Sequence, residues 1–344
     1  MKLKDIAKEA GVSISTVSRV INNKMPCAAS PEVREKILEI VKKNGYSPNI
    51  AAKQLKLGEN SNIGTIKSIA CVFSRTSLKD SFFAQLLRSI TDFVKFNNCI
   101  IKYTLSTFDM NKATIVDIIK NDNLDGIVIL GRCDIEFINE LYHYVPNIVC
   151  TGLQPIDTKG DESFSFDQVY CDSYLMGVSA MEYLFSIGHK KIAYVGETEN
   201  DKRFLAYRKV LKDNGIELEK ENYVNIILSV KGGYEGTKKL LEKNPNITAI
   251  FCANDSTAMG TMRACKEIGL NIPEDISIIG ADDLELTKYL TPTLTTIKAP
   301  IGEIGRLGIT ILFSRIEKKH KSSVNVSLPF TLKERESSTK KLMR

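Results

Sequence analysis

A chain of 344 residues with 43% hydrophobic and 26% charged positions has the composition of a globular protein and room for two or three folded units. Its first residues alternate charge with single apolar side chains, and no later apolar run approaches the roughly 18 residues that span a membrane, so we expect a cytoplasmic protein. Of its net charge of +6, most comes from residues 1–60, where eleven basic side chains face six acidic ones. This excess favours a polyanion as partner, although a solvated helical surface would carry the same charge.

Cysteine and histidine positions argue against metal and redox chemistry. The eight cysteines contain no CxxC pair, and most lie inside apolar stretches such as SIACVF and AIFCAN. The histidines, His143, His189 and His320, have no ligand spacing with one another or with a cysteine. We therefore expect reduced core cysteines, no metal site and no cofactor, with a zinc or thiol-redox site as the alternative.

Two short helices are predicted at the N-terminus. Apolar residues recur at helical spacing over 3–10 and stop at Gly11, the residue type that most easily ends a helix in the left-handed conformation. Ser13 is a good N-cap for a second helix over 14–21. Two short helices joined by a turn that contains glycine form a helix-turn-helix motif.

The second helix has two chemically different faces. Its apolar face comprises Val17, Val20 and Ile21, and the other side or its edge comprises Ile14, Ser15, Ser18 and Arg19. A small, polar and basic surface fits a DNA major groove, where hydroxyls bond phosphates or bases and an arginine bonds guanine in bidentate fashion. The second helix is therefore the predicted recognition helix.

A third helix and a shorter helical segment follow. The run Ser30-Pro31-Glu32 supplies an N-cap, a first-turn proline and a first-turn acid, and Lys42, Lys43 and Gly45 close the helix. Residues 50–57 have helix-forming composition but end at Gly58, and a helix of that length is unstable alone. It would need support from DNA and a partner subunit.

The stretches KDIAKEAGVSISTVSRVINN and SPEVREKILEIVKKNGYSPNIAAKQLKLG closely resemble the DNA-binding headpiece of the lactose and galactose repressor family. The resemblance implies base reading by Ile14, Ser15 and Arg19, with Thr16, Ser18 and Asn22 near phosphates. It also implies a hinge helix over 49–56, in which Asn49 and Lys53 contact DNA and Leu55 opens the central minor-groove step. The loop over 23–29 looks longer than in familiar members of the family, so its contacts are not carried over.

The rest of the chain predicts two open α/β subdomains. From Ser68 onward, short β-branched runs alternate with amphipathic helices, and a second such set follows the polar stretch 157–161. This alternation is typical of parallel sheets with helices on both faces. Ligands of such sheets bind at the carboxyl ends of the strands, here Gly131-Arg132, Asn254-Asp255 and Asp282-Asp283 among others.

The residues at these strand ends favour a binding site over a catalytic one. No nucleophile elbow, glycine-rich phosphate loop, histidine or metal cluster accompanies the paired carboxylates, so we do not expect an enzyme. Side chains of Asp, Asn and Arg can bond both the donors and the acceptors of neutral, hydroxyl-rich ligands such as sugars.

The segments IFCANDSTAMGTMRA, NIPEDISIIGADD and LTPTLTTIKAP extend the resemblance to the family's effector module, which resembles periplasmic sugar-binding proteins. Carried over by position, the candidate effector contacts are Phe82, Phe83, Arg203, Asn254 and Asp282. We expect Asp282 and Arg203 to bond ligand hydroxyls and one of the two phenylalanines to pack on a sugar ring. The alternatives are core positions for Phe82 and Phe83, a helix cap for Asn254 and a surface position for Arg203.

The expected fold is therefore α/β: a three-helix helix-turn-helix headpiece plus hinge helix, then a periplasmic-binding-protein-like domain of parallel sheets flanked by helices. We expect the boundaries 1–48, 49–63, 64–337 and a tail over 338–344, with the subdomains divided near 164 and crossovers near 290 and 322. One branch of the family that the chain resembles forms tetramers through a C-terminal coil of leucine heptads; the tail has no such heptads, so the resemblance favours a homodimer.

The expected function is a transcriptional repressor of carbohydrate-utilisation genes. It would bind a pseudo-palindromic operator in double-stranded DNA and a sugar or sugar derivative as effector, without contacting a membrane. A transport receptor would share the α/β modules but would need a signal sequence, and an enzyme acting on a sugar or nucleotide would need a catalytic constellation.

Overall fold

The computed structural model describes residues 3–21, 30–43, 66–73, 81–95, 97–156 and 166–340. The chain divides into two compact units, 1–65 and 66–344. Each unit has its own hydrophobic core, so each is described by itself.

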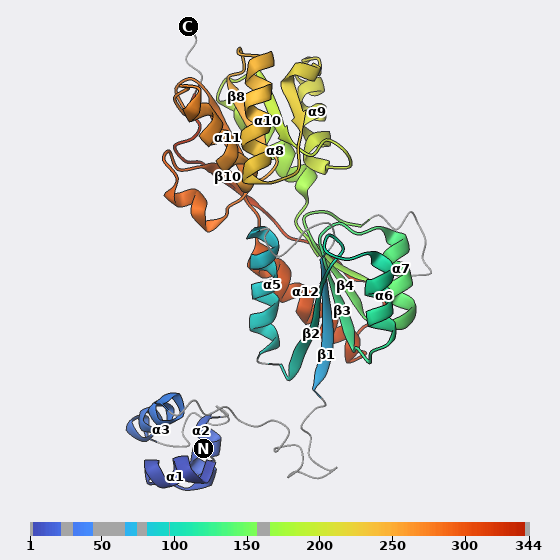
Figure 1. Ribbon diagram of the computed structural model, residues 1–344, viewed down its shortest axis with the longest axis vertical. Helices are drawn as coiled ribbons and strands as arrows, with labels where there is room; N and C mark the ends of the chain where they lie inside the picture. The colour runs from blue at the N-terminus through green and yellow to red at the C-terminus, as the bar shows by residue number, and fades with distance from the viewer. Residues whose placement is uncertain are drawn as a thin grey trace. The chain divides into compact units, whose positions relative to one another are not determined.

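The described residues of the first unit form three helices. They are α1 (Leu3–Ala10), α2 (Ile14–Ile21) and α3 (Pro31–Lys43), as the sequence predicts (Figure 1). Gly11 has φ 73°, and the backbone N–H of Val12 donates to Ala7 O at 3.0 Å, which ends α1. The buried side chains that form the small core are Ile6, Ala7, Ala10, Val17, Val20, Ile37 and Ile40.

Within its described residues, the second unit has two six-stranded sheets, each of which forms the centre of one subdomain. The first sheet has the order β11-β5-β4-β3-β1-β2, and all its described pairs are parallel. Figure 1 shows α5 and α12 on one side of this sheet and α6 and α7 on the other. The elements of the first subdomain are β1 (Lys67–Phe73), α5 (Ser81–Val94), β2 (Cys99–Ser106), α6 (Lys112–Lys120), β3 (Gly126–Leu130), α7 (Ile135–Tyr144), β4 (Ile148–Gly152), β5 (Asp167–Tyr170), α12 (Ile301–Ile316) and β11 (Asn325–Ser327).

The second sheet has the order β12-β10-β9-β8-β6-β7, and its edge strand β12 runs antiparallel to β10. Helices α8 and α9 pack on each other, as do α10 and α11. The elements of the second subdomain are α8 (Ser173–Ser186), β6 (Ile192–Gly196), α9 (Lys202–Asp213), the 3-10 helix η1 (Lys220–Asn222), β7 (Tyr223–Asn225), α10 (Val230–Lys243), β8 (Ala249–Cys252), α11 (Asp255–Glu267), β9 (Ser277–Asp282), the 3-10 helix η2 (Glu285–Tyr289), β10 (Thr295–Lys298) and β12 (Thr331–Lys333). The alternation of strands and helices predicted from the sequence is present in both subdomains.

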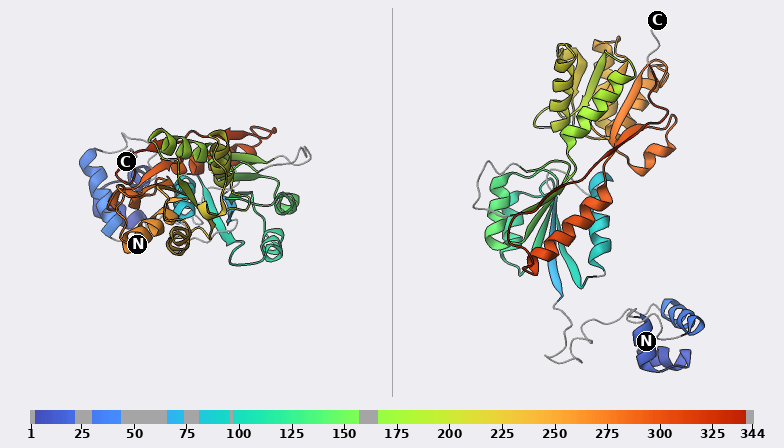
Figure 2. Two further views of the ribbon diagram at one scale, coloured as in Figure 1. Left: turned by 90° about the horizontal axis from the view of Figure 1, so that it is seen from above. Right: turned by 180° about the vertical axis from the view of Figure 1, so that it is seen from behind.

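The chain passes between the two sheets three times. It leaves the first sheet after β5, leaves the second after β10, and returns to the second between β11 and β12. The right-hand view of Figure 2 shows the red C-terminal segment making the last of these passages. Each passage lies C-terminal to the position expected from the sequence, because pairing with β4 keeps β5 in the first sheet and pairing with β9 keeps β10 in the second.

Residues near the C-terminus are part of the second subdomain. The Ser338 hydroxyl lies 2.8 Å from the hydroxyls of Tyr183 and Thr295, and the Thr339 backbone N–H donates to Ser277 Oγ at 3.2 Å. Residues 338 and 339 are therefore anchored by hydrogen bonds, whereas composition alone predicted a tail from 338 onward.

Helices α10 and α11 approach closely through two glycines. A Cβ added to Gly233 would lie 2.1 Å from Thr257 O, and one added to Gly260 would lie 2.0 Å from Val230 O. No side chain fits at either position without moving a backbone. The approach fixes the position of α11, whose first turn reaches the candidate effector site.

A buried ion pair joins three segments of the first subdomain. Asp167 on β5 is fully buried and accepts from Arg315 Nε at 2.6 Å and Nη2 at 2.7 Å, on α12. It also accepts from the backbone N–H of Val324 at 2.8 Å. These bonds attach α12 and the segment before β11 to β5. The chain is therefore fixed to the first sheet between its second and third passages.

Candidate nucleic-acid interface and effector site

Helix α2 presents the polar surface expected of a recognition helix. Ser13 caps the helix, because its Oγ accepts from the backbone N–H of Thr16 at 3.1 Å. Ile14 is 53% exposed and Ser15 is exposed, whereas Val17 and Val20 on the opposite face are buried in the headpiece core. For these four residues, burial agrees with the two faces predicted from the sequence.

Hydroxyl groups gather at the N-terminus of α2. Ser13 Oγ lies 2.6 Å from Ser15 Oγ and 2.9 Å from Thr16 Oγ1. Hydroxyls and backbone N–H groups at a helix N-terminus are well suited to bind phosphate oxygens. Ser18 and Arg19 belong to the same helix, and Asn22, Asn49, Lys53, Leu55 and the loop 23–29 lie outside the described residues.

Arg203 is part of a buried hydrogen-bonded pair, so it is not a surface residue. It is 6% exposed and lies in the first turn of α9. Its Nε and Nη2 donate to the two carboxylate oxygens of Asp201 at 3.0 and 2.8 Å, and its Nη1 donates to Ala253 O at 2.6 Å. Burial opposes ionisation of Asp201, but Arg203 holds the pKa of that carboxyl below its ordinary value.

Asn254 serves as the N-cap of α11. Its Oδ1 accepts from the backbone N–H of Thr257 at 2.9 Å, and the residue is 6% exposed. Because Arg203 bonds the neighbouring carbonyl of Ala253, the pair and the cap lie side by side at the carboxyl end of β8. The structure thus brings Arg203 and Asn254 together. Each makes hydrogen bonds that stabilise the fold, Arg203 to Asp201 and Ala253, and Asn254 to the first turn of α11.

Asp282 ends β9 in an unusual backbone conformation. Asp282 has φ 119° and Asp283 has φ 57°, a region that residues other than glycine rarely adopt. Asp282 is 3% exposed and lines a cavity together with Gln85 and Arg88 on α5 of the first subdomain. Asp282 therefore lies close to both subdomains.

The two phenylalanines differ in burial. Phe82 is 4% exposed and belongs to the core, while Phe83 is only partly buried. Their rings meet edge to face at 5.1 Å, and Phe83 also meets Phe73 at 6.2 Å. Of the two, Phe83 has the surface left for a ligand.

A cavity of about 530 Å³ lies between α5 and the ends of β9 and β10. Of the five predicted effector residues, Asp282 lines it. Its wall is rich in charged groups of both signs, which suits a ligand with many donors and acceptors. The lining residues are Gln85, Arg88, Ser89, Asp92, Asp282, Asp283, Glu285, Lys288, Lys298, Ala299, Pro300, Ile301, Gly302 and Glu303. On α5 the sequence predicted Phe82 and Phe83 but missed the polar side chains that line the cavity, because nothing in the helix pattern says what its polar face meets.

A further contact links the carboxyl ends of both sheets. Arg132, which follows β3, donates Nη2 to a carboxylate oxygen of Glu197 and Nη1 to the carbonyl of Asn200, both of which follow β6. The sequence places Arg132 at a strand end but gives no partner for it. This ion pair joins the two subdomains.

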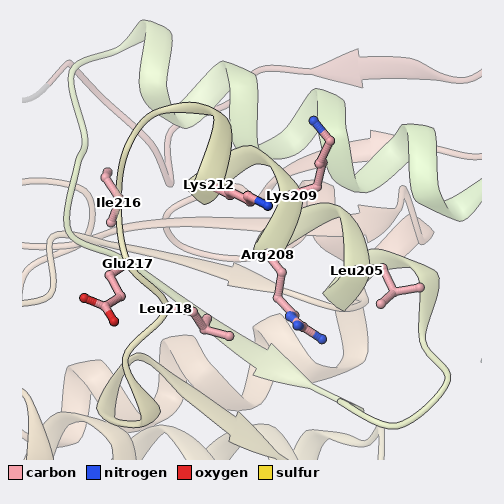
Figure 3. A pocket seen from close by; sticks show the side chains of 7 residues that line it. All are labelled: Leu205, Arg208, Lys209, Lys212, Ile216, Glu217 and Leu218. Atoms are coloured by element: carbon pink, nitrogen blue, oxygen red, sulfur yellow. The ribbon is translucent and has the colours of Figure 1, made fainter.

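A second cavity, of about 450 Å³, contains none of the predicted effector residues. Figure 3 shows its lining, which comes from α9 and the segment after it. The lining residues are Leu205, Arg208, Lys209, Lys212, Ile216, Glu217 and Leu218.

The described residues contain no cluster of three metal-ligating side chains and no helix suited to crossing a membrane. Six cysteines within the described ranges are buried, namely Cys71, Cys99, Cys150, Cys171, Cys252 and Cys265. Burial raises the pKa of Cys71 and Cys265 to about 12, so both stay thiols at neutral pH, as predicted for core residues.

Two family models match the chain. Residues 2–49 match "Bacterial regulatory proteins, lacI family", and residues 181–338 match "Periplasmic binding protein-like domain". The solved LacI family transcriptional regulator from Enterococcus faecalis V583 with bound ribose is 28% identical, with a TM-score of 0.69 over 80% of this chain and 100% of that one. A lac repressor dimer bound to operator shares the fold, with 24% identity, a TM-score of 0.70, and 98% and 99% of the two chains covered.

Curated relatives are similar over nearly the whole length. The HTH-type transcriptional regulator MalR of Clostridium butyricum is 32% identical over 332 residues, which cover 93% of this chain and 95% of that protein. The catabolite control protein A of Priestia megaterium is 29% identical over 97% of this chain and 98% of its own. The chain therefore belongs to the lacI family of bacterial regulatory proteins, which are DNA-binding regulators of transcription.

Proposed function

We propose that this protein is a cytoplasmic repressor of carbohydrate-utilisation genes whose operator affinity is controlled by a sugar. The observation that carries the proposal is the polar cavity between α5 and the ends of β9 and β10, in a chain that also has a helix-turn-helix headpiece. A regulator that responds to a metabolite needs both parts, and neither part needs a catalytic group.

The headpiece binds DNA through α2. The exposed Ile14 and Ser15 read base edges together with Arg19, while Thr16, Ser18 and Asn22 lie near phosphates. One such helix reads a single half-site, so two headpieces of a homodimer would read two half-sites of a pseudo-palindromic operator. Residues 49–56 act as the hinge helix and 57–63 as the linker; Asn49 and Lys53 contact DNA, and Leu55 opens the central minor-groove step.

The sugar binds at the carboxyl ends of the second sheet, against the first subdomain. Asp282, which lines the cavity, accepts hydrogen bonds from sugar hydroxyls. The sugar extends from the cavity to Arg203 and Asn254 at the end of β8 and to the ring of Phe83, which packs on Phe82. The ribose bound in the Enterococcus faecalis neighbour supports this class of ligand. Sugar binding closes the subdomains, and closure changes the spacing of the two hinges.

The DNA part is tested by selecting bound duplexes from a random library with the full-length protein and measuring affinity by fluorescence anisotropy. We expect a palindromic consensus and an affinity that falls log-linearly with salt concentration, because lysines and arginines displace counterions. Leu55→Gly should weaken binding by about tenfold or more, since the cost of opening the central base step is no longer offset. Ile227→Gly, at an exposed residue of the second unit outside the hinge, is the control. No selected consensus, or equal effects of both variants, contradicts the proposal.

The effector part is tested by a thermal-shift screen over sugars, sugar phosphates and purines. A sugar at 100 times its Kd should stabilise the protein by about 2.7 kcal/mol through mass action. Asp282→Asn should abolish the shift, because an amide cannot replace a carboxylate that accepts from two hydroxyls. A shift produced by purines and by no sugar would refute the carbohydrate assignment.

A further inference from the structure

The carboxyl group of Asp255 lies beneath the turn that carries Asp282. Asp255 is the first residue of α11 and is fully buried. Its Oδ2 accepts from the backbone N–H of Leu284 at 2.8 Å, and its Oδ1 accepts from Thr296 Oγ1 at 2.6 Å. The carboxyl therefore connects α11 to the residue directly after the Asp282-Asp283 turn and to β10.

The turn needs such support because its backbone is strained. Two consecutive residues other than glycine with positive φ are strained, and they keep this conformation only where their surroundings fix them. Arg335 holds the turn from the other side, donating Nη2 to Asp283 Oδ1 at 2.5 Å and Nη1 to Thr287 Oγ1 at 3.0 Å and Leu294 O at 2.8 Å. The turn is thus clamped between Asp255 and Arg335.

The buried carboxyl of Asp255 fits only because residue 280 has no side chain. A Cβ at Gly280 on β9 would lie 2.3 Å from Asp255 Oδ1. Any side chain there would displace the carboxyl from Thr296 and Leu284. Gly280 is therefore part of the same arrangement.

Opposing effects act on the pKa of Asp255. Burial raises the pKa of Asp255 to about 7, against the hydrogen bonds from Thr296 and the Leu284 backbone, which lower it. Two charged neighbours act in opposite directions: Asp283 raises this pKa and Arg335 lowers it. The ionisation of Asp255 therefore depends on its burial, on its two hydrogen bonds and on these two charges.

We propose that Asp255 is a positioning residue of the effector site, whose ionised carboxylate holds the Asp282-Asp283 turn more firmly than its protonated form and so sets sugar affinity. The proposal rests on the proposed sugar site. An ionised carboxylate accepts both bonds as charge-assisted ones. When protonated, Oδ1 carries the proton and the Thr296 hydroxyl becomes the acceptor, because the Leu284 N–H facing Oδ2 can only donate. Leu284 then keeps a weaker bond to a neutral oxygen, and the turn loosens.

The turn itself can be observed without any ligand. In the full-length protein labelled with ¹⁵N, the amides of Asp282, Asp283 and Leu284 should shift together with pH, with one common midpoint near 7. Asp255→Asn should hold them at their low-pH positions, because the asparagine Oδ1 accepts from Leu284 and its Nδ2 donates to Thr296. Asp213→Asn, at an exposed carboxylate on α9 that pairs with Lys209, is the control and should leave the titration unchanged.

A second variant keeps the inference falsifiable if Asp255→Asn folds poorly. Thr296→Val removes a bond that lowers the pKa of Asp255, so the common midpoint should move to higher pH. An unchanged midpoint, amides that do not titrate in the wild type, or amides that still titrate in Asp255→Asn would each overturn the inference.

The pH dependence of the free energy of unfolding provides an independent test. A group whose pKa is raised on folding contributes stability that is present at low pH and lost as pH rises toward the folded pKa. The free energy of unfolding of the wild type, measured relative to Asp255→Asn, should therefore rise as the pH falls from 8 to 5. A difference that does not vary with pH would contradict an ionisable Asp255 in the folded protein.

The ligand arm uses D-ribose and calorimetry at pH 6 and pH 8. Wild-type affinity should be about tenfold weaker at pH 6, which corresponds to about 1.4 kcal/mol, and Asp255→Asn should bind with the weaker affinity at both values. Equal wild-type affinities would overturn the positioning role. If ribose does not bind at either pH, ribose is excluded as effector under the proposed function, and the amide titration still decides the inference about the turn.

Discussion

Arg203→Met is expected to destabilise the second unit by about 3–5 kcal/mol, because it leaves the Asp201 carboxylate buried without its cation. The variant also removes the donor to Ala253 O beside the Asn254 cap. Chemical denaturation of the full-length protein measures the loss. The sugar response should disappear with it, while operator affinity in the absence of sugar should persist if the fold is retained.

Two control variants distinguish the loss of the buried ion pair from a general effect of replacing an arginine on α9. Arg208→Met makes the same change five residues later on α9, where Arg208 is exposed, and should change stability by less than about 1 kcal/mol. The double variant Asp201→Asn with Arg203→Met removes the orphaned charge and should recover part of the loss. A loss in Arg203→Met no larger than in Arg208→Met would show that Asp201 does not depend on Arg203.

Val17→Asp is expected to unfold the headpiece and reduce operator affinity by at least about 100-fold, because a small domain cannot bury an unpaired charge. Val17 is fully buried in the core with Ile6 and Ile37. The second unit, which has its own core, should unfold as in the wild type. Anisotropy with operator DNA and thermal unfolding followed by circular dichroism measure the two effects.

Ile14→Asp is the matched control on the opposite face of α2. Ile14 is 53% exposed, so the headpiece should stay folded. Operator affinity should still fall, because the new carboxylate faces the phosphate backbone. Wild-type affinity in Ile14→Asp would exclude this face as the DNA contact, and wild-type affinity in Val17→Asp would exclude the headpiece altogether.

The headpiece could be predicted from the sequence because its signals are local. Gly11 ends α1 and Ser13 caps α2 at the predicted positions, and Ser30 Oγ accepts from the Val33 backbone N–H at 3.4 Å at the start of α3. Each of these bonds joins residues at most five apart, so neighbouring residue types are enough to specify them. The alternation of strands and helices in the second unit was predictable for the same reason.

The effector site was predictable only in outline. The strand-end rule finds Asn254 and Asp282, but the burial of Phe82, the exposure left to Phe83 and the pairing of Arg203 with Asp201 depend on packing. The passages between the sheets were also misplaced by a few residues, since strand pairing, and not composition, assigns β5 and β10 to their sheets.

By itself the sequence determined the recognition helix and the class of fold, because helical periodicity, caps and β-branched runs act over a few residues. Only the tertiary structure decided what Asp255 does, since its partners Leu284 and Thr296 lie 29 and 41 residues away. The same holds for the turn between Asp255 and Arg335 and for the close approach of α10 to α11. Such contacts depend on how separate elements pack, and no local pattern records which buried groups will meet.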